Sequence, residues 1–211
     1  MLTKHLPDTT RGRIVTLLHH GPSTVDDLAS ALNLTSNAVR AHITGMERDG
    51  LVRRGGTRRG TTRPSLLFDL TPEVEQLLSK AYLPLLIQLV RVFAAELPAK
   101  QMESLLRRTG KALARELAGG RSTAGSLQSR VDSASNLLNE QLGALTRVER
   151  NGEYVIRGAS CPLAALTGKH PGVCRAMESL VSDVVGRRVR ECCERQGRPR
   201  CCFHISKGKA S

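Results

Sequence analysis

Three short amphipathic helices in quick succession most constrain how this chain can fold. Apolar residues recur at helical spacing from Arg11 to His20, and the pair Gly21-Pro22 predicts the end of that helix. Ser23 is placed to cap a second helix, whose expected buried side consists of Val25, Leu28, Ala29 and Leu32. The pattern therefore predicts a helical N-terminal unit that buries these apolar sides.

A third helix is predicted from Thr35 or Ser36, either of which can cap it, to about Asp49. Gly50 follows at the position where a left-handed residue commonly ends a helix. Its spacing gives two faces. The face expected to pack on the second helix consists of Val39, Ile43 and Met46. The other face is expected to be exposed and consists of Asn37, Arg40, Ala41, Thr44 and Arg48.

A basic hairpin is predicted directly after these helices. Leu51-Val52 begins one strand, and residues 66–70 supply the returning one. The segment 53–63 between them contains no acidic residue and five arginines, Arg53, Arg54, Arg58, Arg59 and Arg63. Such a hairpin suits the minor groove or the flanking phosphates of a DNA duplex. A basic loop without regular structure is the alternative interpretation.

Three helices, the basic hairpin and the following Thr71-Pro72-Glu73 resemble, in this order, the winged-helix regulators of the ArsR, MarR and DeoR type. The resemblance implies that the third helix enters the major groove and that the protein is a homodimer. The candidate DNA-binding residues are Ser36, Asn37, Arg40, Ala41, Thr44, Arg48, Arg53, Arg54, Arg58, Arg59 and Arg63.

Composition agrees with a double-stranded DNA partner. The chain has 32 Lys and Arg against 19 Asp and Glu, a net charge of +13, which attracts polyanions. A basic surface kept for solubility is the alternative. Aromatic residues make up only 2% of the chain, which argues against the stacking platforms that bind single strands.

The middle of the chain is predicted to be helical. Thr71 can cap a helix with Pro72 at its first position, and Pro84 predicts a kink or break in the apolar stripe that follows. Further helices are expected at about 100–117 and 127–145. The stripe is either part of an ordinary core or, over Leu83–Phe93, the contact between two copies in a symmetric dimer.

All six cysteines lie in the last quarter of the chain: Cys161, Cys174, Cys192, Cys193, Cys201 and Cys202. The sequence shows no membrane span and no signal peptide, so we expect a cytoplasmic protein whose thiols are mostly reduced. Clustered cysteines in that compartment indicate metal or redox chemistry rather than a disulfide framework.

Strand geometry narrows the choice of ligands. Hairpins are predicted around Asn151-Gly152 and, from 189–193 to 201–205, around Gly197. Centring on Gly197 sets Cys193 opposite Cys201 and Cys192 opposite Cys202. Neighbouring residues on a strand face opposite ways, so only one of these pairs can share a site. That pair with Cys161 and Cys174, the latter in the first turn of a helix opened by Pro171, would provide four thiolates for a [4Fe–4S] or [2Fe–2S] cluster or for Zn²⁺.

The cysteine-rich end is similar to SufR-like iron–sulfur regulators. The similarity lies in Cys161-Pro162, the interval of twelve residues to Cys174 with His170-Pro171 before it, and the run from Gly197 through Cys201 to Phe203 and Ile205. Members of that family are winged-helix repressors of cluster-biogenesis operons. The resemblance implies that the ligands are Cys161, Cys174, Cys201 and a further residue, either Arg188 or Cys193 by position. Cys193 is the one with a suitable side chain.

The resemblance implies a [4Fe–4S] cluster in preference to a [2Fe–2S] cluster. Cys192 and Cys202 have no counterpart in the family, and His170 is either a further ligand or a capping or packing residue.

The sequence as a whole predicts an α+β, mostly helical protein in three parts. These are a winged helix-turn-helix domain (1–72), a helical linker and dimerisation region (73–145) and a small α+β cysteine-rich sensor domain (146–211). The predicted function is transcription regulation, as a repressor whose operator affinity an iron–sulfur cluster controls. A winged-helix regulator that senses zinc or another metal, or the thiol redox state, is the alternative. We expect no enzymatic activity, because the six histidines are scattered and no acid/base constellation stands out.

Overall fold

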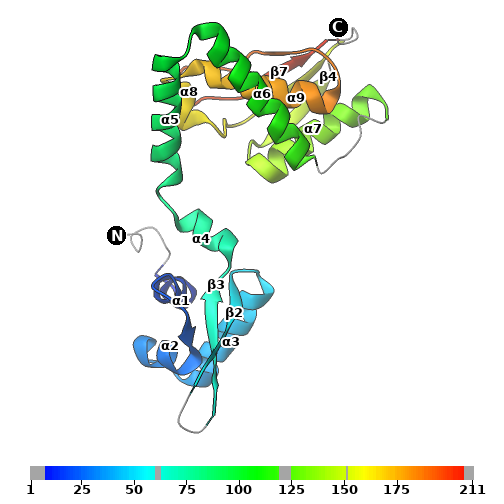
Figure 1. Ribbon diagram of the computed structural model, residues 1–211. Coiled ribbons are helices and arrows are strands. Elements are labelled where there is room, and N and C mark those ends of the chain that lie inside the picture. Colours follow the sequence, from blue (N-terminus) through cyan, green and yellow to red (C-terminus); the bar gives the residue numbers. More distant parts are fainter. Residues whose placement is uncertain (1–7, 60–62, 119–124, 151, 207–211) are drawn as a thin grey trace. The chain divides into compact units, whose positions relative to one another are not determined.

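The computed structural model describes residues 8–59, 63–118, 125–150 and 152–206 of the chain (Figure 1). The chain divides into two compact units, Met1–Leu83 and Pro84–Ser211. We describe each unit by itself. Together they contain mostly helices with two small antiparallel sheets, which confirms the predicted α+β class.

The first unit contains three helices and a three-stranded sheet. The helices are α1 (Thr10–Leu18), α2 (Val25–Leu32) and α3 (Ser36–Arg48), and the strands are β1 (Ser23–Thr24), β2 (Val52–Arg58) and β3 (Ser65–Leu70), in the order β1-β3-β2. A fourth helix, α4 (Pro72–Leu78), follows β3. One core unites the apolar sides predicted for the three helices with Val52, Phe68 and Leu70 of the sheet.

Two of the predicted helix caps differ from the structure. Ser23 lies in β1, and Thr24 caps α2 through a capping box in which its hydroxyl accepts from the Asp27 amide while the Asp27 carboxylate accepts from the Thr24 amide. The hydroxyl of Thr71 caps no helix, because it donates instead to the Gly50 carbonyl at 2.9 Å. The Thr24 contact ties the start of α2 to β1. The Thr71 contact ties the start of α4 to the turn between α3 and β2.

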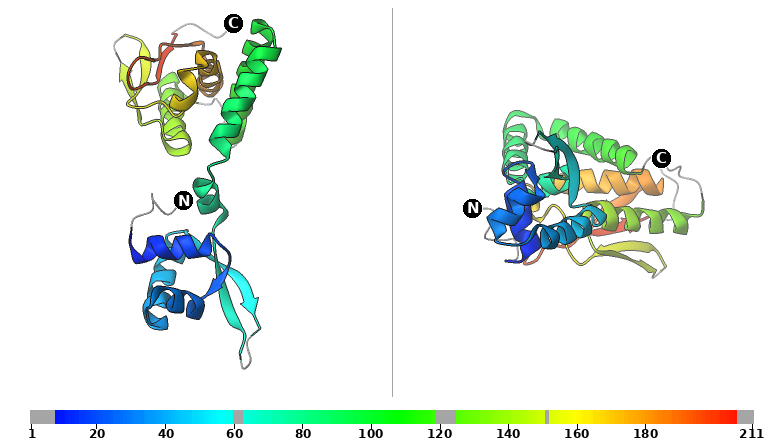
Figure 2. Two further views of the ribbon diagram at one scale, coloured as in Figure 1. Left: turned by 90° about the vertical axis from the view of Figure 1, so that its left-hand side faces the viewer. Right: turned by 90° about the horizontal axis from the view of Figure 1, so that it is seen from below.

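The second unit packs helices against a four-stranded antiparallel sheet (Figure 2). Its helices are α5 (Tyr82–Glu96), which begins just before the unit boundary, α6 (Ala99–Leu117), α7 (Leu127–Leu142), α8 (Ala164–Thr167) and α9 (Cys174–Val185), the last preceded by the 3₁₀ turn η2 (Pro171–Val173). The strands are β4 (Thr146–Arg150), β5 (Tyr154–Gly158), β6 (Val189–Glu191) and β7 (Cys202–Ile205), in the order β4-β5-β7-β6.

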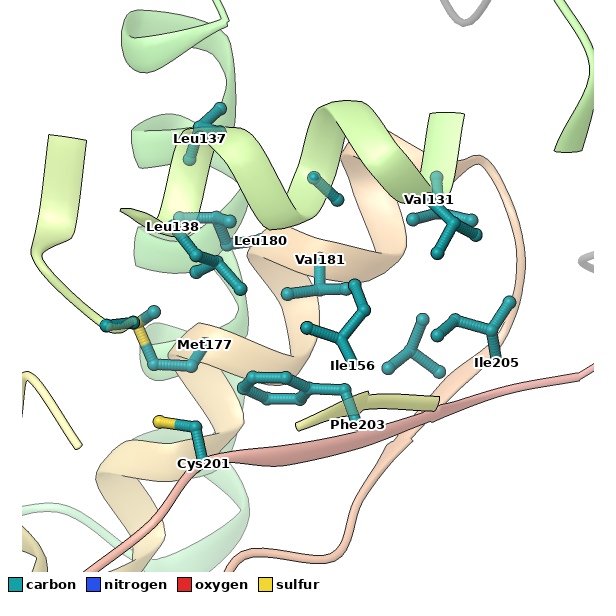
Figure 3. Close-up of a cluster of buried hydrophobic side chains, with 14 of the residues drawn as sticks. Val131, Leu137, Leu138, Ile156, Met177, Leu180, Val181, Cys201, Phe203 and Ile205 are labelled. Carbon is teal, nitrogen blue, oxygen red and sulfur yellow. The ribbon is translucent and has the colours of Figure 1, made fainter. Parts of the chain in front are cut away.

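A single core joins the predicted linker to the predicted sensor domain. Leu138 of α7, Leu180 of α9 and Phe203 of β7 are fully buried in one cluster, to which α6 adds Ala114 (Figure 3). Helices α6 and α7, which the sequence assigned to the linker region, therefore share a core with the cysteine-rich sheet. The sequence placed a boundary at 145/146 because the periodicity changes there from helix to strand, and periodicity does not show which elements share a core.

The closest helix contact in this core is made at Gly110. A Cβ atom built on Gly110 of α6 would lie 2.0 Å from the carbonyl oxygen of Ala176 in α9. Only a residue without a side chain allows the two helices to approach this closely. This close packing fixes α9, whose first residue is Cys174.

The predicted apolar stripe from Leu77 to Phe93 is split between α4 and α5. The break falls at residues 79–81, and Pro84 lies in the first turn of α5, where the missing amide hydrogen breaks no helical hydrogen bond. α5 packs inside its unit through Val90, which lies in a small cluster with Leu166 and Val173. Large apolar side chains of α5 nevertheless remain exposed: Tyr82, Leu83, Leu85, Leu86, Leu89, Val92 and Phe93.

Within the described residues, no single helix has the length and apolarity needed to cross a membrane, although α4 and α5 taken as one bent pair satisfy that test by length and composition.

Candidate metal centre and DNA-binding surface

The faces of α3 are divided as the sequence predicted. Val39, Ile43 and Met46 are buried against the rest of the first unit, and Thr35 caps the helix by accepting from the Ala38 amide at 3.3 Å. Most of the candidate DNA-binding residues of the helix are exposed: Asn37, Arg40, Ala41, Thr44 and Arg48. Ser36 is half-buried and donates to the Asp26 carboxylate at 2.8 Å.

Three of the five hairpin arginines are held by acidic partners that sequence analysis missed. β2 extends to Arg58, so Arg53, Arg54 and Arg58 lie on a strand that pairs with β3. These guanidinium groups bind the carboxylates of Asp69 at 3.2 Å, Glu47 at 3.2 Å and Asp27 at 2.8 Å, respectively. The segment itself contains no acid, but the fold brings acids from α2, α3 and β3 beside it.

The two remaining hairpin arginines, Arg59 and Arg63, are exposed on either side of residues 60–62, which lie outside the described residues.

The ion pair between Arg58 and Asp27 changes the pKa of the Asp27 carboxyl group. The Arg58 hydrogen bond, helped by the Thr24 amide, lowers the pKa of Asp27 from 3.8 to about 2. Arg58 therefore links the hairpin to α2, and its guanidinium group would have to leave Asp27 to contact a ligand.

Four cysteines of the second unit lie together. The thiol groups of Cys161 and Cys201, of Cys201 and Cys193, and of Cys193 and Cys174 lie close enough to shift one another's pKa. Cys174 and Cys201 are buried, and Cys161 and Cys193 are half-buried. The structure thus brings together the four residues that the sequence singled out, from four separate segments of the chain.

Backbone pairing places these cysteines. The Gly158 amide at the end of β5 donates to the Cys201 carbonyl at 2.8 Å, and the Cys201 amide donates to the Ser160 carbonyl at 3.3 Å, which sets Cys161 beside Cys201. A Cβ atom on Gly158 would lie 2.9 Å from the Ser160 carbonyl oxygen and 3.3 Å from Cβ of Cys201. Glycine at 158 therefore permits the close approach that forms the group.

Hairpin register selects the members contributed by β6 and β7. Glu191 pairs with Phe203, and Glu194 pairs with Arg200 in an isolated bridge, so the hairpin is centred on residue 197 as predicted. The Cys202 amide donates to Sγ of Cys193 at 3.4 Å. Each strand is shorter than the sequence predicted, and the cysteine pair 193/201 lies just beyond the regular ladder.

The four thiol groups share their protons unequally. Hydrogen bonds donated by Cys174 and Cys201 lower the pKa of Cys193, and the Cys201 hydrogen bond lowers the pKa of Cys161 to about 7. The pKa values of Cys174 and Cys201 are raised, first because their hydrogen bonds to these neighbours favour the protonated donor and then because they are buried. Cys193 and Cys161 are therefore the members of the group that lose their protons more readily.

Acidic and basic side chains adjoin the thiol group, and sequence analysis missed them. A carboxylate oxygen of Glu191 and the sulfur atoms of Cys174 and Cys193 lie within 4.8 Å of one another. Glu191 also forms an ion pair with Arg195, whose guanidinium group hydrogen-bonds Cys174. A sequence signal for Glu191 exists only after the register is known, because it lies two residues before Cys193 on the same strand.

The donor set fits a thiophilic metal, since thiolates are the ligands of iron–sulfur clusters and of structural zinc. A zinc ion and an iron–sulfur cluster require different distances between their sulfur ligands. A tetrahedral zinc ion with bonds of about 2.3 Å brings its sulfur ligands to about 3.8 Å from one another. Among the described residues, the groups of three possible ligands within 4.8 Å contain at most two of these four cysteines. Thiolates are ligands of both groups, so the donor set fits either zinc or an iron–sulfur cluster.

The other two cysteines form a disulfide. Cys192 and Cys202 are bonded across the hairpin with their Cα atoms 4.9 Å apart. The sequence predicted that Cys192 and Cys202 face each other, and the structure confirms this. The expectation that the clustered cysteines form no structural disulfide is wrong for this pair. His170 occupies the cap position of η2 without a side-chain capping bond.

The first unit is a winged helix-turn-helix domain, a class of module that binds double-stranded DNA through its third helix. Residues 8–55 match the helix-turn-helix domain family. No protein with a curated description matches the chain.

Two bacterial proteins are among the solved structures similar to part of the chain. ZitR of Lactococcus lactis, as its C30AH42A mutant in apo form, is 17% identical, with a TM-score of 0.29 over 48% of this chain and 76% of that one. The adhesin competence repressor AdcR of Streptococcus pyogenes is 22% identical, with a TM-score of 0.29 over 48% of this chain and 73% of that one.

Proposed function

We propose that this protein is a DNA-binding transcription regulator, acting as a repressor, whose operator affinity is controlled by a [4Fe–4S] cluster bound to Cys161, Cys174, Cys193 and Cys201. The observation that carries the proposal is the convergence of these four cysteines beside the core of the second unit. Four thiolates are the usual ligand set of such clusters.

The chain's own residues supply binding and orientation. The Cys202 amide, which donates to Sγ of Cys193, is the kind of hydrogen bond to sulfur that sets the potential of a cluster. Arg195 lies against Cys174 and offsets part of the negative charge of the thiolates. When bound, a cluster would make occupancy of this site sensitive to iron supply and to oxidants.

Control of DNA binding requires that the DNA-binding and non-binding states differ in their affinity for the cluster. Glu178 of α9 connects the thiol group to the helices of the second unit. Its buried carboxylate accepts from the Glu191 amide at 3.0 Å and binds Arg107 of α6 at 3.1 Å. The Cys193 amide in turn donates to the Glu191 carboxylate at 3.3 Å. Hydrogen bonds and an ion pair therefore connect Cys193 to α6 through Glu191 and Glu178.

A homodimer completes the proposal. α5 exposes seven large apolar side chains on one helix, which is more than a soluble monomer usually leaves uncovered. A second copy of the chain is the occupant that a regulator requires, because two reading heads bind two half-sites of an operator. Sedimentation of the anaerobic protein tests this, and a monomer at micromolar concentration would contradict it.

In the first unit, we assign base and phosphate contacts to Ser36, Asn37, Arg40, Ala41, Thr44 and Arg48 and to the hairpin arginines. The guanidinium groups of Arg59 and Arg63 are the strongest hairpin candidates, since the other three already bind carboxylates. Arg40→Ala combined with removal of the hairpin should abolish promoter binding. Unchanged binding would refute the assignment.

Anaerobic purification tests the cluster. We expect a coloured protein with iron and acid-labile sulfide, lost in Cys161→Ser/Cys201→Ser and kept in the matched control Cys192→Ser/Cys202→Ser, which leaves all four proposed ligands in place. Electrophoretic mobility shifts with the loaded and cluster-free protein then measure the coupling to DNA. A colourless wild-type protein without iron after reconstitution would refute the cluster.

Zinc sensing is the second candidate function. It is favoured by the group of Cys174, Glu191 and Cys193, whose ligand atoms lie close enough together for one ion. Metal analysis of the anaerobic protein separates the two, because zinc in place of iron would support this alternative. By the SufR-like resemblance we propose cluster-biogenesis genes as the regulated targets. We propose the cytoplasm as the compartment, as expected for a regulator that binds DNA.

A further inference from the structure

A second set of metal ligands lies on the opposite side of the same hairpin. Cys192, Cys202 and His204 offer two sulfur atoms and a ring nitrogen within 4.8 Å of one another. We propose that, once the disulfide is reduced, Cys192, Cys202 and His204 bind a Zn²⁺ ion at a site separate from the four-thiol group.

Strand alternation creates this second set. Cys202 and His204 are two residues apart on β7 and share one face of the sheet, whereas Cys201, Phe203 and Ile205 face the core. Cys192 pairs directly with Cys202 across the hairpin, which brings its side chain to the same face. Cys192 and His204 are partly exposed and Cys202 is buried, so an ion has access from one side of an otherwise closed site.

The surroundings fit a cation held by two thiolates. Oε2 of Glu153 lies 4.0 Å from Nδ1 of His204, so an acidic group adjoins the imidazole ring without being hydrogen-bonded to it. Arg157 pairs with Cys202 and Arg190 with His204 in the sheet. A Zn²⁺ ion bound to two thiolates adds no net charge beside these basic residues.

The ligand set identifies the ion. Two cysteine sulfurs and one histidine nitrogen match the ligands of zinc sites that keep a fourth, open position for water or another molecule. Thiolate ligands disfavour Mg²⁺ and Ca²⁺, which take oxygen ligands.

The site depends on a balanced redox step. A dithiol reductant transfers two electrons and two protons to the Cys192–Cys202 bond and itself becomes a disulfide. The two thiols formed then lose their protons to solvent as Zn²⁺ binds both sulfur atoms. In reverse, a disulfide oxidant removes two electrons from the two thiolates, the S–S bond forms again, and the ion is released. The same two residues thus hold either a covalent bond or a metal ion.

Chelator competition with Zn²⁺ alone tests the proposal on full-length protein that has been reduced with a phosphine and desalted under nitrogen. The reduced protein should bind about one more equivalent of Zn²⁺ per chain than the protein with the disulfide intact. Both Cys192→Ser/Cys202→Ser and His204→Asn should lose that equivalent. His20→Asn, an exposed histidine in the first unit, is the matched control and should keep it.

The measurement is a difference, so it stands whether or not the four-thiol group also takes Zn²⁺. If that group binds none, the reduced protein still gains the equivalent that His204→Asn lacks, and only the other proposal is affected. Equal zinc content before and after reduction, or full zinc content in a folded His204→Asn protein, would overturn the second site. Circular dichroism establishes that each variant is folded.

Discussion

Glu178→Ala should destabilise the second unit more than any other single change to a charged residue of α9. The Glu178 side chain is only 7% exposed and accepts from Arg107, from Arg175 at 2.9 Å and from the Glu191 amide. Truncation leaves that amide without its acceptor, at a cost of about 1–3 kcal/mol. It also removes two ion pairs.

The two ion pairs contribute little to the free energy of unfolding, although Glu178 itself is buried. The guanidinium groups of Arg107 and Arg175 are 42% and 41% exposed, so water solvates them when Glu178 is lost, and each pair is worth about 0.5–1 kcal/mol. We therefore expect Glu178→Ala to lower the free energy of unfolding by about 2–5 kcal/mol. Glu178→Gln retains an acceptor for the Glu191 amide and should cost about 1–2 kcal/mol.

Urea unfolding followed by circular dichroism measures both values, with Asp183→Asn, an exposed carboxylate on the same helix, as control. A second readout separates stability from connection to the thiol group. Because Glu178 fixes the strand that precedes Cys193, Glu178→Gln should also weaken metal binding by about tenfold, as outer-shell changes do. A Glu178→Ala protein as stable as Asp183→Asn would refute the reasoning.

Three further predictions concern packing, pH and DNA. Gly110→Ala should lower the free energy of unfolding by about 1–3 kcal/mol, because the added methyl group forces α6 away from the Ala176 carbonyl. Urea unfolding measures this loss, and a variant as stable as wild type would contradict the close contact. Asp27→Asn should lower the free energy of unfolding by about 1 kcal/mol at pH 7 after solvent screening. The difference from wild type should disappear as the pH falls from about 4 through 2, because the folded pKa is the lower one; urea unfolding that shows the same difference at pH 2 and pH 7 would contradict the lowered pKa. Arg40→Ala should weaken operator binding about tenfold in mobility shifts with an unchanged unfolding midpoint, and equal affinity would remove it from the interface.

The sequence predicted most of what depends on short-range patterns. The two faces of α3 follow from helical spacing, and the register around Gly197 follows from the symmetry of the cysteine pairs about one glycine. Both depend on residues within a few turns or one hairpin of each other. The break between α4 and α5 was misplaced because Pro84 is tolerated in the first turn of a helix, where the sequence pattern alone suggested a kink.

What the sequence did not predict depends on long-range contacts. The acids that hold the hairpin arginines come from other elements: Asp27 is more than thirty positions from Arg58. The shared core of α7 and β7 joins residues that no periodicity connects. Glu178 and Glu191 are ordinary charged residues in the sequence, and only the packing of α9 beside β6 brings the Glu178 carboxylate to the Glu191 amide.

The alternation of a β-hairpin explains how six cysteines in one small region can serve two purposes. Cys193 and Cys201 lie on the side of the hairpin that faces Cys161 and Cys174, and the adjacent Cys192 and Cys202 face the other way, toward His204. A shift of one residue in the register would exchange the two sets, because side chains on a strand alternate. The symmetric turn at Gly197, with its positive φ of 66°, fixes that register. Sorting of the cysteines is therefore a property of the turn as much as of the cysteines themselves.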